Sequence, residues 1–131
     1  MVAFTILKEK SEKTDTNLNI SDDISSWVAD SKTDQSVVAV IALSTCHYCA
    51  QYKPIITEIA EENSLKLYWF EIDTLNEADS SALTSTYSLT QYSGSSPYTF
   101  ITKNGEFIND VVGYMPKEDT LTFLKDNGVI E

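Results

Sequence analysis

The chain has 131 residues, a length that fits one domain with a sizeable hydrophobic core. Hydrophobic residues make up 42% and charged residues 22%, which are ordinary values for a globular protein and exclude a disordered one. Twenty acidic residues against nine lysines give a formal charge of −11, and no arginine is present. This charge argues against nucleic acid and anionic membranes as partners, because both are bound through Lys and Arg.

The sequence contains no apolar run of the roughly 18 to 20 residues that a membrane helix needs. Residues 1–8 also lack the basic start and long apolar stretch of a signal peptide. We therefore expect a cytoplasmic protein, monomeric and with one domain over residues 1–131. In that compartment a transient catalytic disulfide is more plausible than a permanent structural one.

The first half of the chain alternates between apolar runs and helical periodicity. Ser21-Asp22-Asp23 is a helix-start signal, and the apolar run 37–43 is typical of a buried parallel strand. The predicted elements are a strand at 2–7, a polar surface connection at 8–20, a helix ending near Asp30, a strand at 37–43 and a helix at 46–63.

The second half continues the alternation and closes with a hairpin. Asn104-Gly105 is the hairpin signal, and Gly128 is suited to end the last helix. The predicted elements are a strand at 65–73, a helix at 77–87, a Ser/Thr/Tyr/Gly-rich stretch to 96, strands at 98–102 and 106–112, and a helix opened by Met115-Pro116-Lys117-Glu118. This order predicts an α/β fold with a central mixed β-sheet flanked by helices on both faces.

Cys46-His47-Tyr48-Cys49 stands where the apolar strand 37–43 gives way to a helix, and it holds the only two cysteines of the chain. Two cysteines at this spacing can form a reversible disulfide, and a helix N-terminus favours the thiolate of the first. The motif predicts a thiol–disulfide oxidoreductase. Cys46 is the expected nucleophile, and Cys49 the thiol that resolves the mixed disulfide.

Three further features lie at characteristic separations from the cysteine pair along the chain. They are Pro54 inside the helix, Ser96-Pro97 before a strand, and the hairpin 102–106 followed by Val112-Gly113. Together the four features resemble the thioredoxin superfamily over most of the chain. The resemblance implies a thioredoxin fold without a cofactor, and protein disulfides or dithiols as substrates. It also implies a reductase or oxidase that recycles the pair.

The resemblance assigns roles to four residues around the cysteines. Pro97 is expected to follow a cis peptide bond, so that the backbone of Ser96 faces Cys46 and pairs with an extended substrate peptide. Gly113 is expected to leave room for the substrate backbone, and Pro54 to shape the helix and kink it. A trans proline at a strand start is the alternative for Pro97, and a plain strand-end role is the alternative for Gly113.

His47 and Tyr48 are the residues between the cysteines and are expected to modulate them. A partly protonated His47 would favour the Cys46 thiolate and make the disulfide more oxidising than that of thioredoxin, about −270 mV. Tyr48 is expected to shape the surface around the pair. The alternatives are an exposed His47 without effect on the thiols and a packing role for Tyr48.

The sequence departs from thioredoxins proper at five positions. Thr45 replaces the tryptophan before the first cysteine, and His47-Tyr48 replaces Gly-Pro. The buried acid and its lysine partner correspond to Val40 and Trp69, so a proton acceptor for Cys49 is missing. The Thr-Cys-x-Tyr-Cys arrangement also resembles bacteriocin transport accessory proteins, thioredoxin-like proteins of Gram-positive bacteria.

Two other function classes stay open at this point. The first is a non-catalytic accessory or peptide-binding module that keeps the fold and holds peptides at its cis-proline surface. The second is a metal site, in which Cys46, His47 and Cys49 bind Zn²⁺ or an iron–sulfur cluster at a dimer interface. Three ligands do not complete a tetrahedral site within one chain, so we expect no metal.

Overall fold

Five strands form one mixed sheet in the computed structural model, which describes residues 20–87 and 95–130. They are β1 (Ile20–Ser21), β2 (Val37–Ala42), β3 (Lys66–Glu71), β4 (Tyr98–Lys103) and β5 (Glu106–Val112). The strand order is β1-β3-β2-β4-β5. β1 and β2 pair in parallel with β3, whereas β4 pairs antiparallel with both β2 and β5.

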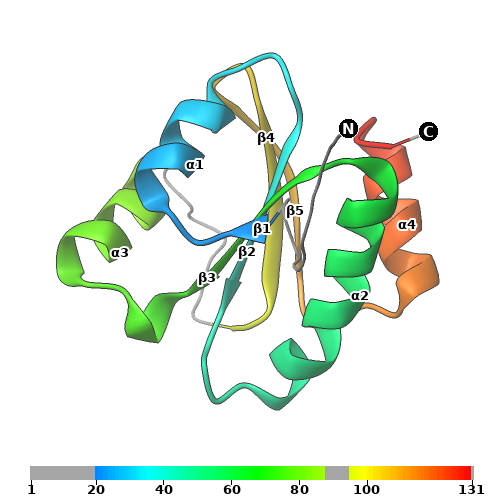
Figure 1. Ribbon diagram of the computed structural model, residues 1–131, viewed down its shortest axis with the longest axis horizontal. Coiled ribbons are helices and arrows are strands. Elements are labelled where there is room, and N and C mark those ends of the chain that lie inside the picture. Colours follow the sequence, from blue (N-terminus) through cyan, green and yellow to red (C-terminus); the bar gives the residue numbers. More distant parts are fainter. Residues whose placement is uncertain (1–19, 88–94, 131) are drawn as a thin grey trace, which may run out of the picture.

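Within the described residues, four helices cover the sheet: α1 (Ile24–Ser31), α2 (His47–Asn63), α3 (Glu77–Ser85) and α4 (Lys117–Asp126). Figure 1 shows α1 and α3 on one face and α2 and α4 on the other. This arrangement confirms the predicted α/β class with a mixed sheet and helices on both faces. None of the helices in the described part of the chain is long and apolar enough to cross a bilayer.

β2 is the central strand of the sheet, and all six of its residues are buried. Because side chains alternate along a strand, each face of β2 contributes to a different core. Val38, Val40 and Ala42 pack in the core that also contains residues of α2 and α4. Val37, Ala39 and Ile41 pack with Trp27 of α1 and Leu83 of α3 in the core on the other face.

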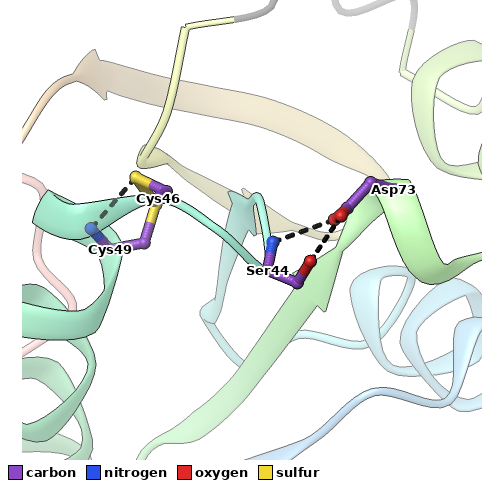
Figure 2. Close-up of a disulfide and its surroundings, with 4 residues drawn as sticks. All are labelled: Ser44, Cys46, Cys49 and Asp73. Atoms are coloured by element: carbon purple, nitrogen blue, oxygen red, sulfur yellow. Dashed lines mark hydrogen bonds between the residues drawn. A yellow bond between two sulfur atoms is a disulfide. The ribbon is translucent and has the colours of Figure 1, made fainter.

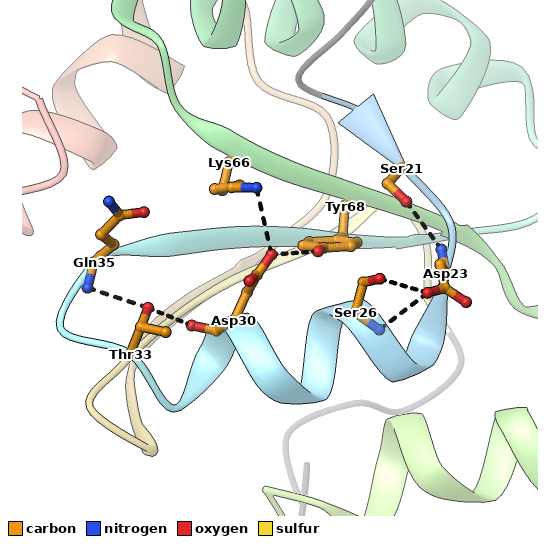
Figure 3. A network of polar contacts seen from close by, with 8 residues as sticks. All are labelled: Ser21, Asp23, Ser26, Asp30, Thr33, Gln35, Lys66 and Tyr68. Carbon is orange, nitrogen blue, oxygen red and sulfur yellow. Dashed lines mark hydrogen bonds and ion pairs between the residues drawn. The ribbon is translucent and has the colours of Figure 1, made fainter.

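Asp30 fastens α1 to the sheet (Figure 3). The Tyr68 hydroxyl donates a hydrogen bond of 2.5 Å to Asp30 Oδ2, and Lys66 Nζ lies 3.7 Å from the same atom. At the start of α1, the Asp23 carboxylate accepts a hydrogen bond of 3.1 Å from the Ser26 N–H and so caps the helix. The contacts of Asp30 hold the C-terminal end of α1 against β3, and the Asp23 cap orders its N-terminal end.

The structure corrects the predicted start of the fold. Ile20 was expected in a surface connection and Ser21 at a helix start, yet both pair with β3 as a short strand, opposite Leu67 and Tyr68. Two residues carry no sequence periodicity, so only the open edge of β3 makes them a strand. The predicted strand at 2–7, most of the connection at 8–20, and residues 88–94 lie outside the described residues.

Other predicted boundaries move by one or two residues. The strand predicted at 65–73 ends at Glu71, and a 3₁₀ turn, η2 (Ile72–Thr74), follows it. The helix predicted at 77–87 ends at Ser85. The helix predicted from Cys46 begins at His47, because Cys46 itself is the capping residue.

Candidate active site

Cys46 and Cys49 form a disulfide at the start of α2, directly after the turn that leaves β2 (Figure 2). Their Cα atoms are 5.1 Å apart. Cys46 is the N-cap of α2, and its sulfur accepts a hydrogen bond of 3.1 Å from the Cys49 N–H. Because the first amides of a helix have no partner within the helix, they stabilise negative charge on a sulfur at this position.

The two sulfur-bearing residues differ in exposure. Cys46 is half-buried, whereas Cys49 is only 2% exposed and belongs to the core between α2 and the sheet. The Cys46 sulfur is therefore the more accessible of the two. The roles of nucleophile and resolving thiol stay predictions.

Asp73 holds the turn that carries the cysteines (Figure 2). The Ser44 N–H donates a hydrogen bond of 2.9 Å to Asp73 Oδ1, and the Ser44 hydroxyl donates one of 2.5 Å to Oδ2. Hydrogen bonding from Ser44 lowers the pKa of the Asp73 carboxyl. Sequence reasoning missed this contact, and the only available signal was an acid at the end of the strand predicted at 65–73.

Ser96, Pro97 and Gly113 lie next to one another in the structure. The Ser96–Pro97 peptide bond is cis, and the Gly113 N–H donates a hydrogen bond of 2.8 Å to the Pro97 carbonyl oxygen. Gly113 has a φ of +105°, a conformation that favours glycine. None of the described residues lies within 4 Å of the position that a Cβ would take there, so the backbone conformation and not crowding among these residues favours the glycine.

A second aromatic residue that the sequence did not single out, Tyr114, lies beside Tyr48. Their ring centroids are 6.1 Å apart, and 57% of Tyr48 and 38% of Tyr114 is exposed. Tyr48 and Tyr114 form an exposed aromatic surface, which we call the tyrosine patch, connecting the start of α2 with the loop of Gly113. The available signal was an aromatic residue directly after Gly113.

His47 lies on the exposed first turn of α2. Its ring centroid is 5.5 Å from that of Tyr48, and its Nε2 atom is 2.9 Å from Nε2 of Gln51. α2 continues as one helix through Pro54 to Asn63. No group of three or more His, Cys, Asp and Glu side chains within residues 20–87 and 95–130 is placed to hold a metal ion.

Val40 and Trp69 occupy the positions of the acid and lysine that the resemblance predicts to be missing. They are directly opposite each other on β2 and β3, and both are buried. Lys53 Nζ lies 5.4 Å from the Trp69 ring centroid. The nearby Tyr52 hydroxyl is 3.0 Å from Thr99 Oγ1, and burial raises the pKa of Tyr52 to about 12. An apolar and aromatic wall therefore replaces the acid–lysine pair.

A cleft of about 690 Å³ opens beside the disulfide, between α2 and the end of β3. Both cysteines line it, and so does Trp69. Its charged lining comes from Lys53, Glu58, Glu61 and Glu71. We call it the α2 cleft; sequence reasoning did not find it, because β3 and the turn after β2 complete it.

No protein-family profile and no curated protein sequence matches the chain. Solved structures match strongly. A single-site variant of thioredoxin from Halobacterium salinarum NRC-1 aligns at 16% identity with a TM-score of 0.64, over 82% of this chain and 88% of that one. Oxidised mitochondrial thioredoxin 3 from Saccharomyces cerevisiae aligns at 14% identity with a TM-score of 0.62, over 82% of this chain and 93% of that one. The chain therefore has the thioredoxin fold that the sequence predicted.

Proposed function

We propose that the protein is a thiol–disulfide oxidoreductase that exchanges disulfides with protein substrates through Cys46 and Cys49. The observation that carries this proposal is the disulfide in the first turn of α2, with Cys46 half-buried as the cap and Cys49 buried. A disulfide that only stabilised the fold would not need one accessible sulfur at a helix N-terminus.

In the reducing direction, the Cys46 thiolate attacks one sulfur of a substrate disulfide. A bond forms between Cys46 and that sulfur, and the other substrate sulfur leaves as a thiolate. Cys49, after losing its proton, attacks Cys46 Sγ, re-forms the Cys46–Cys49 disulfide and releases the second substrate thiolate. Two electrons pass from the cysteine pair to the substrate. A cellular reductase restores the dithiol, or an oxidase restores the disulfide if the reaction runs in reverse.

The surface around Cys46 is suited to an extended peptide. Ser96 and Gly113 flank Pro97, and the backbone of Ser96 is the proposed partner of a substrate strand. The tyrosine patch supplies apolar contact area next to it. Exposed aromatic residues bind peptides well, because they bury a large area at low entropic cost.

The proposal is tested by the reduction of insulin with dithiothreitol. We expect the protein to accelerate insulin precipitation, Cys46→Ser to abolish the acceleration, and Cys49→Ser to accumulate a mixed disulfide that mass spectrometry detects. A wild-type protein without any acceleration would contradict the proposal for protein substrates.

The accessory-module alternative rests on the tyrosine patch, which would bind a peptide without any redox step. The variant Cys46→Ser/Cys49→Ser separates the two functions. Unchanged affinity for a partner captured by the Cys49→Ser variant, together with unchanged partner activity, would favour the accessory module.

A further inference from the structure

The α2 cleft begins at the reactive sulfur and follows one side of α2. Its lining residues on the helix recur every three or four positions, from Cys46 through Ala50, Lys53 and Thr57 to Glu61. At a rise of 1.5 Å per residue, the cleft runs for about 22 Å along the helix. An extended peptide covers that length with about six or seven residues.

The charges of the cleft favour a basic occupant. Glu58, Glu61 and Glu71 line it, and Lys53 is the single cation among the described residues of the lining. Glu58 pairs with Lys117, at 3.0 Å between Nζ and Oε1. Within the described residues neither Glu61 nor Glu71 forms an ion pair. A cation of a ligand therefore has two carboxylates that are not already neutralised.

Two buried polar groups of residues that line the cleft have no hydrogen-bond partner within the described residues. Trp69 is 4% exposed, and its ring N–H has no acceptor among the described residues. Thr57 Oγ1 is likewise buried without a partner in this part of the chain. An indole nitrogen can only donate, and leaving a buried donor unpaired is unfavourable. A peptide carbonyl oxygen would supply the acceptor, once the flexible Lys53 side chain moves off the ring.

We propose that the α2 cleft binds the part of the substrate that flanks its reactive cysteine, and that this part is basic. The reactive cysteine lies at Cys46, and apolar side chains contact Pro54 and Trp69. A lysine or arginine about four residues away extends its long side chain to Glu61, and to Glu58, where it replaces Lys117. This inference rests on the proposed function and names the class of its substrates.

The test measures how fast Cys46 attacks peptides of different charge. The parent protein is Cys49→Ser, which leaves one thiol. The peptides carry cysteine as a mixed disulfide with 2-nitro-5-thiobenzoate, the better leaving group, and its release is followed by absorbance. Each peptide has lysine, or uncharged norleucine, four residues before or four residues after the cysteine.

We expect lysine, placed either before or after the cysteine, to make the peptide react about two- to fivefold faster than its norleucine counterpart. This is the size of effect that an exposed ion pair gives. The preference should disappear in Glu58→Gln/Glu61→Gln. It should persist in Glu106→Gln/Glu118→Gln, which removes the same charge from exposed positions outside the cleft lining. High salt should weaken it.

Three results would overturn the inference. The first is no preference for lysine on either side of the cysteine, and the second is an unchanged preference in Glu58→Gln/Glu61→Gln. The third is an equal loss of the preference in the control variant Glu106→Gln/Glu118→Gln. The last result would assign the preference to the net charge of −11 alone. The proposed function fails separately, if no peptide reacts faster with the parent protein than with a free cysteine peptide.

Discussion

Ser44 and Asp73 connect the turn before the cysteines to the 3₁₀ turn after β3. Both oxygens of the Asp73 carboxylate accept hydrogen bonds from Ser44, one from the backbone N–H and one from the hydroxyl. Ser44 precedes Cys46 by two residues, so Asp73 acts on the sulfur only through the backbone. It is a positioning residue, placed where a loop would otherwise have an unpaired amide.

The contact between Ser44 and Asp73 predicts a dependence of stability on pH. Because the folded state lowers the pKa of Asp73, its contribution is present above the ordinary Asp value, about 3.9, and is lost as the pH falls through the lowered pKa. Urea midpoints of wild type and Asp73→Asn should differ at pH 7 and converge below about pH 4. A difference that stays constant down to pH 3 would contradict this prediction.

The tyrosine patch predicts a selective loss of activity with large substrates. Tyr114→Ala should lower kcat/KM for a protein disulfide about three- to tenfold, because an aromatic contact is lost from the binding surface. Reduction of 2-hydroxyethyl disulfide, which is too small to span the patch, should be unchanged and serves as the control. Equal losses on both substrates would place Tyr114 in the fold and not in recognition.

His47 predicts a shift in redox potential. Because a positive charge on the imidazole next to Cys46 in the chain would favour the Cys46 thiolate, replacing His47 with Ala should make the disulfide less oxidising by about 10–30 mV. Equilibration with glutathione mixtures measures the shift, and the rate of Cys46 alkylation should fall with it. Gln51→Ala, which keeps the imidazole, is the matched control. A potential unchanged in His47→Ala would show that the exposed ring has no effect on the sulfur.

The buried position of Val40 predicts a large loss of stability when a charged side chain is placed there. Because Val40 is fully buried opposite Trp69, Val40→Asp should destabilise the protein by about 3–5 kcal/mol at pH 7. Burial raises the pKa of such a carboxyl, so the loss should shrink as the pH falls and the acid is protonated. Urea unfolding at pH 7 and pH 4 checks both, with Val40→Thr as an uncharged control of similar size.

Sequence patterns predicted the elements that have strong local signals. β2 is a continuous apolar run, and α2 begins where the cysteines stand, so both were found within one residue. β1 was missed, because a two-residue strand depends on the edge of β3 and not on its own sequence. Local signals thus suffice for long elements and fail for short ones.

The site was predictable only where its residues belong to a motif. Cys46, Cys49, Pro97 and Gly113 follow from spacing and resemblance, and the structure brings Pro97 and Gly113 together. Asp73 and Tyr114 could not be assigned, because each acquires its partner from a segment distant in sequence. The α2 cleft is likewise a product of tertiary packing.

The position of β2 has a consequence for the protein under partial denaturation. Amides in a central, fully covered strand exchange with solvent last, whereas edge strands open at lower free energy. The cysteine turn follows this slowest-opening strand. Fraying of β1 or β5 should therefore leave the positions of the two sulfurs unchanged. Thiol–disulfide exchange should continue under conditions in which the edge strands have already opened.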